Sequence, residues 1–451
     1  MTDSARRTWL TATGSALAAV AGLLLPVFGT GGTAQATTGA APATTGTTTG
    51  AALATTGTTT GGLHVRDGRL YEANGSEFVM RGVNHAHAWY PGETGALADI
   101  AAKGANTVRV VLSSGDRWTG TTASEVASVI DDCKANEVIC VLEVHDTTGY
   151  GEDAAATTLD RAADYWIGVR SALRGQEDHV LVNIGNEPFG NNGYTAWTGA
   201  TKNAVVKLRN AGIENALMVD APNWGQDWSH TMRDNAASVF ASDPRRNTIF
   251  SIHMYGVYDT AAEVQGYLNH FVSNGLPIVV GEFGDNHSDG NPDENAIMAT
   301  ARSLRVGYLG WSWSGNGGGV EYLDLVTGFD PNALTAWGDR LFNGADGIVA
   351  TSKRATVYGG GGGETGGTAP NGYPYCLNGG SSDPDGDGWG WEAGRSCVVR
   401  GSAADTGGTT GGTAPNGYPY CLNGGSSDPD GDGWGWEAGR SCVVRGSAAD
   451  H

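Results

Sequence analysis

The chain has 451 residues, and its 27 Lys and Arg against 48 Asp and Glu give a formal net charge of -21. A surface this acidic repels polyanions, which excludes nucleic acid and anionic membranes as partners and favours a neutral ligand. The 72 glycines gather in low-complexity stretches, so we expect one large folded domain with smaller ones beside it.

The N-terminus has the pattern of a secretory signal. Arg6 and Arg7 precede an apolar stretch at residues 16–28, and Ala34-Gln35-Ala36 follows as a cleavage site, which predicts a signal peptide over 1–36 and an extracellular protein. Pro26 breaks the short apolar stretch, which argues against a membrane-spanning helix. The paired arginines leave Sec and twin-arginine export both open. Residues 37–62, almost all Thr, Gly and Ala, read as a leader that cannot form a core.

Residues 63–348 alternate apolar runs with segments of helical periodicity. The apolar positions of segment 159–169, for example, recur at three- and four-residue steps and so fall on one helix face. Repeated strand-helix units predict an α/β fold, specifically a closed (β/α)8 TIM barrel that forms the catalytic domain. The expected strands are residues 78–86, 106–113, 138–145, 179–186, 216–222, 248–255, 277–283 and 308–314.

The six cysteines fit an oxidising compartment. Cys133 and Cys140 fall in the large domain, where we expect a disulfide; two buried thiols at a helix end and a strand start are the alternative.

The C-terminal part contains an exact repeat. After a Gly-rich linker at 349–365, segment 366–405 recurs unchanged as 411–450, with a second linker at 406–410. Each copy is too small for a large core, so we expect two small β-rich modules stapled by Cys376–Cys397 and Cys421–Cys442.

Two glutamates stand where apolar strands end. Glu187 lies in Gly-Asn-Glu-Pro and Glu282 in Gly-Glu-Phe-Gly. In a parallel barrel the C-terminal strand ends share one mouth, so the two carboxyl groups are expected to meet there. One protonated and one ionised carboxyl group are what cleavage of a glycosidic bond requires. A salt bridge or a helix cap is the structural alternative for either residue.

Other strand ends carry polar and aromatic residues. Arg109 interrupts an apolar strand, where a cation is costly unless a carboxylate meets it, and we expect it to help keep Glu282 ionised. His253 and Tyr255 are two apart on one strand and should share a face, as should Trp311 and Trp313.

His145 stands in the motif Glu-Val-His-Asp (143–146) in the same layer, at the end of the third expected strand. Together these strand-end residues indicate a site rather than separate core residues. Over residues 63–348 the sequence resembles glycoside hydrolase family 5, and more narrowly its bacterial endo-β-1,4-mannanases. The resemblance rests on the motifs Arg-Gly-Val-Asn-His-Ala-His-Ala-Trp-Tyr (81–90), Leu-Glu-Val-His-Asp (142–146), Asn-Glu-Pro (186–188), His-Met-Tyr (253–255), Gly-Glu-Phe-Gly (281–284) and Trp-Ser-Trp-Ser-Gly-Asn (311–316).

The resemblance implies roles for individual residues. Glu187 would be the acid/base and Glu282 the nucleophile of a retaining double displacement, with Asn186 holding the sugar 2-hydroxyl. The remaining family positions of the active site would be Arg109, His145, His253, Tyr255 and Trp311.

Flat aromatic rings bind the apolar face of a pyranose. Trp89 and Trp224, in loops beyond the first and fifth strands, are the candidates for subsites flanking the cleaved bond, with plain packing as the alternative.

In each repeat, Trp-Gly-Trp places two indoles on one side of an extended strand. The repeat resembles family 10 carbohydrate-binding modules, whose exposed aromatics bind crystalline cellulose, but it lacks the usual upstream Cys-x-Trp-Tyr segment. A miniature core is the alternative role of these rings. The candidate binding residues are Tyr373, Trp389 and Trp391 in the first module and Tyr418, Trp434 and Trp436 in the second.

No metal site is predicted. The acidic run that starts at Asp383 lacks the twelfth-position acid of a calcium loop, because Gly394 stands there, and reads better as a tight turn; a structural calcium ion is kept as an alternative.

The sequence therefore predicts a secreted, monomeric endo-β-1,4-mannanase that acts on mannan, glucomannan and galactomannan without a cofactor. The modules would tether it to cellulose in plant cell wall. The alternatives are an endo-β-1,4-glucanase on the same scaffold and a noncatalytic, lectin-like wall-binding protein.

Overall fold

The computed structural model describes residues 61–359 and, beyond them, 369, 373, 375–376, 383, 388–392, 395–399, 402–405, 414–418, 420–421, 427–428, 430–437 and 440–450. The predicted signal peptide at 1–36 and residues 37–60 of the leader lie outside the described residues. Within the described parts of the chain, no helix has the length and apolar character that a membrane crossing requires.

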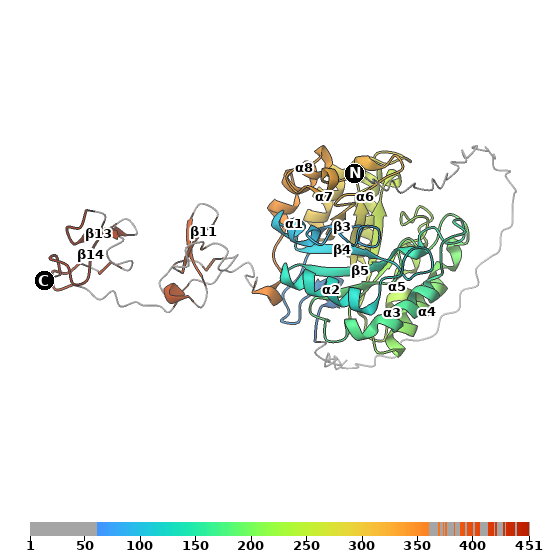
Figure 1. Ribbon diagram of the computed structural model, residues 1–451, viewed down its shortest axis with the longest axis horizontal. Helices are drawn as coiled ribbons and strands as arrows, with labels where there is room; N and C mark the ends of the chain where they lie inside the picture. Colours follow the sequence, from blue (N-terminus) through green and yellow to red (C-terminus); the bar gives the residue numbers. More distant parts are fainter. Residues whose placement is uncertain are drawn as a thin grey trace, which may run out of the picture. The chain divides into compact units, whose positions relative to one another are not determined.

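Eight parallel strands close into a barrel, in which the last strand pairs with the first (Figure 1). Each lies inside or within one residue of an expected strand, so the (β/α)8 prediction is confirmed. The strands are β3 (Arg81–His85), β4 (Thr107–Leu112), β5 (Ile139–Val144), β6 (Val180–Asn183), β7 (Leu217–Asp220), β8 (Thr248–Met254), β9 (Ile278–Phe283) and β10 (Gly307–Gly310).

Helices surround the strands (Figure 1). They are α1 (Ala96–Ala102), α2 (Ala123–Ala135), α3 (Leu159–Leu173), α4 (Trp197–Asn210), α5 (Thr231–Ser242), α6 (Ala261–Ser273), α7 (Glu294–Leu304), α8 (Ala336–Asn343) and α9 (Ile348–Thr351). Short 3-10 turns follow several strands: η1 (His145–Thr147), η2 (Tyr194–Ala196), η3 (Gly256–Tyr258), η4 (Glu321–Leu323), η5 (Thr327–Phe329) and η6 (Thr356–Tyr358).

The helices begin where their sequences provide caps. Thr122 accepts the Glu125 N–H while the Glu125 carboxylate accepts the Thr122 N–H, a capping box that satisfies two end groups of α2. The Thr158 side chain accepts the Arg161 N–H and so caps α3, and the Thr260 side chain accepts the Glu263 N–H and so caps α6. The buried face of α3 is the one that the periodicity predicts: Leu159, Ala162, Ala163, Trp166 and Val169.

A hairpin that the sequence analysis missed closes the N-terminal end of the barrel. Strands β1 (His64–Arg66) and β2 (Arg69–Tyr71) pair antiparallel and bury Leu63 and Leu70 in the apolar cluster formed by the inward-facing residues near the strand starts. Ala355 joins the same cluster, and the Tyr358 hydroxyl donates to the Val138 carbonyl oxygen at 2.9 Å. The packed domain thus reaches Tyr358, past the expected end at residue 348.

The expected Cys133–Cys140 disulfide was wrong. Cys133, on α2, and Cys140, on β5, are free, buried thiols, as the alternative had it. Burial raises the pKa of the Cys140 thiol, and its hydrogen bond with Cys133 raises it further. A thiol that keeps its proton is a poor nucleophile, so the pair is stable as thiols in this packed layer.

The two repeats have the same fold. Strands β11 (Trp389–Glu392) and β12 (Arg395–Val398) pair antiparallel, as do β13 (Trp434–Glu437) and β14 (Arg440–Val443); η8 (Ala403–Asp405) follows in the first copy. The Cys376–Cys397 and Cys421–Cys442 disulfides are present as predicted. In each copy a Tyr ring meets a Trp ring edge-on at 4.8 Å, namely Tyr373 with Trp389 and Tyr418 with Trp434. The side chains of Trp391 and Trp436 lie outside the described residues.

A buried ion pair fastens α4 to the start of β8. Two guanidinium nitrogens of Arg209 donate to the carboxylate of Asp243 at 2.9 and 3.0 Å, and that carboxylate also accepts the N–H groups of Arg245 and Asn247. Burial works to raise the pKa of Asp243, but these partners outweigh it and leave the pKa lowered. A lowered pKa means that the stabilisation is present at neutral pH and lost as the pH falls below the ordinary range of an Asp.

We expect Asp243→Ala to lower the free energy of unfolding by about 3–5 kcal/mol, because it leaves the Arg209 charge buried without a partner. Urea denaturation followed by circular dichroism measures the loss, which should shrink in acid. The control is Asp160→Ala, which removes an exposed partner of Lys207 and should cost less than about 1 kcal/mol. Equal losses in both variants would contradict the assignment.

Candidate active site

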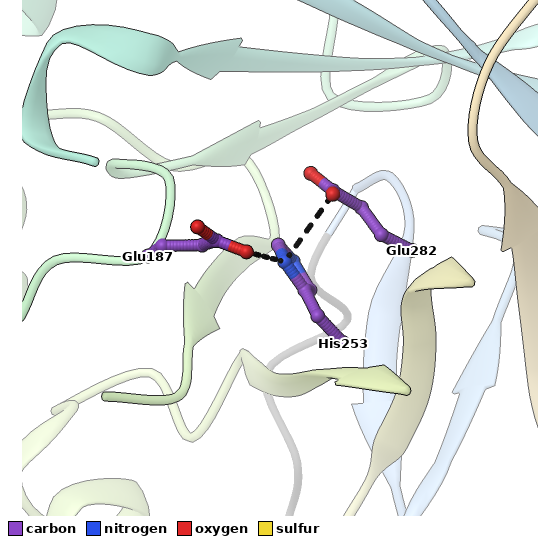
Figure 2. A group of neighbouring side chains, drawn as sticks. All are labelled: Glu187, His253 and Glu282. Atoms are coloured by element: carbon purple, nitrogen blue, oxygen red, sulfur yellow. Dashed lines mark hydrogen bonds and ion pairs between the residues drawn. The ribbon is translucent and has the colours of Figure 1, made fainter. Parts of the chain in front are cut away.

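Glu187 and Glu282 face each other across the mouth of the barrel, at the C-terminal strand ends (Figure 2). Glu187 follows β6, Glu282 lies on β9, and an oxygen of one carboxyl group lies within 4.8 Å of an oxygen of the other. His253, on β8, stands between them: its Nδ1 is 2.8 Å from Glu187 Oε1 and 3.5 Å from Glu282 Oε2. The structure thus brings together the two acids that the sequence places far apart.

Arg109 is the centre of the hydrogen-bond network beneath the acids. It is fully buried on β4, and all five of its N–H donors are used. Nη1 donates to Glu282 Oε1 at 2.8 Å and Nη2 to Asn186 Oδ1 at 2.7 Å. The other acceptors are Asn183 Oδ1 (2.8 Å), Asn84 Oδ1 (2.9 Å) and Asp220 Oδ2 (3.0 Å).

Burial and neighbouring charges shift the pKa values of the site residues in opposite directions. Burial raises the pKa of Glu282, whereas His253 and Arg109 work to lower it, so the expected role of Arg109 holds in direction although burial is the stronger effect. For His253, burial works to lower the pKa, but Glu282 and Asp220 raise it to about 10. These two carboxylates therefore favour the protonated form of His253. Burial and Glu282 raise the pKa of Tyr255, whose hydroxyl donates to Glu282 Oε2 at 3.0 Å.

A β-bulge aims the nucleophile candidate. Along β8 and β9 the register pairs Ile252 with Val280 but His253 with Glu282, so Gly281 is the extra residue. A Cβ on Gly281 would lie 2.1 Å from Ser251 Oγ and 3.4 Å from His253 Nε2. Only glycine allows this approach, and the bulge turns Glu282 to the same side as His253.

Glu187 is held in a strained backbone conformation just past the end of β6. Its φ is 39°, in the left-handed region that a side chain with a Cβ rarely adopts. Its N–H points to Asp220 Oδ2 at 3.4 Å, and its carbonyl oxygen accepts the Gly149 N–H at 3.0 Å. Such strain persists only where the surroundings fix it, as they do at catalytic positions.

Aromatic residues line one side of the mouth. His145 stacks on Trp311 at 5.6 Å and meets Trp89 edge-on at 5.0 Å, while its Nδ1 faces Glu143 Oε1 at 2.7 Å. Trp313 does not share this face: it is buried among the residues between barrel and helices. The expectation of a shared face was wrong because β10 ends at Gly310, before the strand alternation can reach either tryptophan.

The mouth opens into two cavities that share Glu187 as a lining residue. One, of about 400 Å³, is lined by both glutamates with Trp89, His145 and Trp311; the other, of about 270 Å³, is lined by Glu187 but not by Glu282. Glu187, Tyr255 and His287 line both.

Trp224, one of the two subsite candidates, lines the second cavity. Asn223, Trp224 and Gly225 are successive left-handed residues, so the loop turns sharply there. The Trp224 Nε1–H donates to Glu152 Oε2 at 2.6 Å, and its ring packs so closely on Gly149 that a Cβ there would lie 2.2 Å from it. The ring is thus held in one orientation.

The sequence analysis missed Trp228, which lines the same cavity and is 48% exposed. Its Nε1–H donates to Asn191 Oδ1 at 2.7 Å, and its ring rests edge-on against Tyr194. Its place four residues after Trp224 in one loop was the available signal.

Four buried polar residues under the acids were also missed as site residues: Asn84, Glu143, Asn183 and Asp220. Each stands at or near the C-terminal end of its strand, directly after apolar residues. A polar residue in that position of a barrel strand was the signal that could have found them.

Two groups among the described residues place three possible metal-ligand atoms close together. The first is Glu187, His253 and Glu282, in which His253 Nδ1 lies 2.8 Å from Glu187 Oε1 and 3.5 Å from Glu282 Oε2. The second is Asp428, Asp430 and Asp432, where the Asp428 carboxylate already accepts the N–H groups of Gly431, Asp432 and Gly433. That is the tight acidic turn that the repeat predicts.

A (β/α)8 barrel with two facing carboxyl groups, a charged network beneath them and an aromatic-lined cleft defines a glycoside hydrolase. The family model described as "Cellulase (glycosyl hydrolase family 5)" matches residues 71–317, more than half of the chain. The chain belongs to glycoside hydrolase family 5. The model described as "Cellulose or protein binding domain" matches residues 365–399 and 410–444, one match in each repeat.

Two named relatives each match about three quarters of the chain. A mannan endo-1,4-beta-mannosidase of Streptomyces lividans is 78% identical over 345 residues, covering 76% of this chain and 90% of the relative. One of Cellvibrio japonicus is 55% identical, covering 75% and 80%. The solved mannotriose complex of Thermomonospora fusca beta-mannanase is 60% identical with a TM-score of 0.64, covering 66% of this chain and 99% of that one.

The Gly281 bulge gives a test of how the site is positioned. We expect Gly281→Ala to lower stability by about 1–3 kcal/mol through overpacking and to reduce kcat for polysaccharide hydrolysis, because Ser251 and His253 must shift. The control is Gly266→Ala on α6, where nothing lies within 4 Å of the added Cβ; it should raise stability by about 0.5–1 kcal/mol and leave kcat unchanged. Wild-type kcat in Gly281→Ala would refute the role of the bulge.

Proposed function

We propose that this protein is a secreted endo-β-1,4-mannanase that cleaves internal bonds of mannan, glucomannan and galactomannan. The site geometry supports hydrolysis of a glycosidic bond, and the relatives named above as mannan endo-1,4-beta-mannosidases support mannan as the substrate. The long, two-sided cleft supports attack within a chain, because sugar units fit on both sides of the acids.

The separation of the two acids is the observation that carries the mechanism. Retaining glycosidases hold their carboxyl groups about 5–5.5 Å apart, whereas inverting ones need about 6.5–9.5 Å to admit a water molecule. An oxygen of Glu187 lies within 4.8 Å of an oxygen of Glu282, which favours double displacement with retention.

In the first step, Glu282 attacks the anomeric carbon while Glu187 gives its proton to the leaving oxygen, so the sugar-sugar bond breaks and a glycosyl-enzyme ester forms. In the second step, ionised Glu187 takes a proton from water, whose oxygen attacks the same carbon and releases Glu282. No cofactor is needed, because the two carboxyl groups supply both the nucleophile and the proton.

Neighbouring residues have supporting roles in this proposal. Arg109 and Tyr255 each donate to one oxygen of Glu282, which orients the nucleophile. Asn186, fixed by Arg109 and donating to Thr148 Oγ1 at 2.9 Å, is placed to bind the sugar 2-hydroxyl. His145 and Trp311 would bind the sugar whose bond is cut and Trp89 the sugars before it, while Trp224 and Trp228 would bind the leaving side.

The modules would hold the enzyme on plant cell wall by binding cellulose. In the second copy, Tyr418 is 47% and Trp434 38% exposed, which leaves the ring pair open to a flat polysaccharide. Tethering raises the local concentration of the barrel at mannan lying against cellulose. In this proposal residues 1–36 are removed on export, 37–62 and 359–365 are spacers, and 366–405 and 411–450 are the binding modules of a monomer.

An endo-β-1,4-glucanase on the same scaffold is the alternative, and the description of the matching family model favours it. Only the substrate distinguishes the two activities.

The assay measures reducing ends released from galactomannan and from carboxymethyl cellulose. We expect preference for galactomannan, a loss of about 10²–10⁴-fold in kcat for Glu187→Ala from missing acid/base assistance, and a loss at least as large for Glu282→Ala, which has no nucleophile. On an aryl β-mannoside with a strongly acidic phenol, formation of the glycosyl-enzyme in Glu187→Ala should be nearly normal, since that leaving group needs no proton.

The control is Glu214→Ala, which removes an exposed glutamate paired with Arg245 and should keep wild-type rates. Full activity in either acid variant would end the enzymatic proposal, and preference for the cellulose derivative would make the protein a glucanase.

A second test concerns the modules in the full-length protein. Replacing Trp389 and Trp434 together by Ala should weaken binding to crystalline cellulose by about tenfold or more, since each lost stacking contact is worth about 1 kcal/mol. Turnover of soluble galactomannan should stay unchanged. Pull-down on cellulose measures the binding, with Val349→Ala, an exposed apolar change on the barrel domain, as the control. Undiminished retention would refute the role of these rings.

A further inference from the structure

Asp220 is a fully buried carboxylate at the end of β7 that the two-acid mechanism does not use. Its Oδ1 accepts Asn183 Nδ2–H at 2.9 Å, and its Oδ2 accepts Arg109 Nη2–H at 3.0 Å. Oδ2 also lies 3.4 Å from His253 Nε2 and 3.4 Å from the main-chain N–H of Glu187. The Asp220 side chain thus contacts Arg109, which binds Glu282; His253, which lies between the two acids; and the main chain of Glu187.

Three of the four neighbours of this carboxylate are donors, namely Arg109, Asn183 and the main-chain N–H of Glu187, and the fourth is a ring nitrogen of His253. Asn183 cannot be turned around, because its Oδ1 accepts Arg109 Nε–H at 2.8 Å and its Nδ2 must then face Asp220. A group at this position must therefore accept on both oxygens, which an ionised carboxylate does and an amide cannot. The neighbouring charges also favour an ionised Asp220. Burial works to raise its pKa, but Arg109 and His253 lower the pKa to about 2.

His253 is enclosed by carboxylates on both sides of its ring. Nδ1 faces Glu187 and Glu282, at 2.8 and 3.5 Å, and Nε2 faces Asp220 (Figure 2 shows the first two contacts). A neutral imidazole donates from one nitrogen only. With Nδ1 protonated, its Nε2 lone pair would face Asp220; with Nε2 protonated, its Nδ1 lone pair would face the ionised nucleophile Glu282. The doubly protonated ring alone suits all three contacts.

We propose that Asp220 is a positioning residue of the glycosidase reaction, which anchors Arg109 and acts as the counter-ion that keeps His253 an imidazolium between Glu187 and Glu282. The inference rests on the proposed roles of those two glutamates.

The consequence is a fixed positive charge beside both acids. The charged groups facing His253 are Glu187 after β6, Asp220 on β7 and Glu282 on β9; Arg109, on β4, contacts Asp220 and Glu282. With Asp220 in place, Nδ1–H of His253 always points at the acids and holds their oxygens at the spacing that double displacement needs. Without it, the ring can lose its proton and the donor on one side.

The test is Asp220→Asn in the full-length protein, which keeps the shape but puts an NH2 group against a donor in either orientation. We expect kcat on galactomannan to fall roughly 10- to 100-fold, the range seen when a partner of a site residue is removed, with KM changed less than about threefold. Asp220→Glu, which keeps the charge, should recover part of kcat and serves if the amide variant folds poorly.

A second measurement does not depend on activity. In ¹⁵N-histidine-labelled protein, the His253 signals are assigned by their loss in His253→Gln and followed as the pH changes. We expect the wild-type ring to stay doubly protonated through neutral pH, in line with its pKa of about 10. Its titration should move down by about one unit or more in Asp220→Asn and much less in Asp220→Glu.

Asp243→Asn is the matched control, because it also alters a buried carboxylate paired with an arginine. Asp243 lies near the N-terminal end of β8, whereas His253 lies near the C-terminal end of that strand. The change should therefore lower stability but leave both kcat and the His253 titration unchanged. An unmoved His253 titration in Asp220→Asn, or wild-type kcat in that variant, would overturn the inference. If instead Glu282→Ala stays active, the proposed function fails while the titration still reports on Asp220.

Discussion

The site depends on one buried cation. Arg109 projects from β4 into the barrel, where water cannot solvate its charge, and its five N–H donors are met by five acceptors from surrounding strands and strand ends. Burial works to lower its pKa, but Glu143, Asp220 and Glu282 outweigh burial and leave the pKa raised. A guanidinium has a rigid planar fork, so satisfying all five donors fixes the relative positions of the groups that accept them.

The barrel makes this arrangement possible because its closed parallel sheet points every strand end at one mouth. Glu282 would be costly as an anion at this depth, and Arg109 and His253 offset that cost from two sides. Glu187 is placed by backbone geometry instead: its left-handed conformation comes right after β6, and the loop beyond it is tied to the neighbouring loop. Glu282 is therefore positioned by charged side chains, whereas Glu187 is positioned by its main chain and by the contact of its carboxyl group with His253.

Local patterns in the sequence predicted the strands, the buried face of α3, the module disulfides and the two glutamates that meet at the mouth. Other site residues, such as Asn186, were predicted only from the resemblance to a known family. Apolar runs with polar ends mark β6 and β9 directly, and a period of 3.6 marks α3. What sequence reasoning missed depends on non-local geometry. The β1–β2 hairpin is too short to show a period, the Gly281 bulge exists only relative to β8, and Trp313 leaves the site because β10 stops at Gly310. The Cys133–Cys140 pair shows that suitable spacing and a favourable compartment do not by themselves place two sulfur atoms at bonding geometry.

The two cavities also explain why the polar residues are distributed unevenly around the acids. The cavity that both glutamates line has the charged network beneath it, since the carbon that changes bonding and gains positive charge would lie there. The cavity beyond Glu187 has Trp224 and Trp228, held in place by the side chains of Glu152 and Asn191. A leaving sugar only has to be gripped and released, and a ring face does that without holding its hydroxyls in a fixed pattern. The cavity on the Glu282 side therefore offers polar groups that can distinguish one sugar from another, whereas the cavity beyond Glu187 offers mainly ring faces.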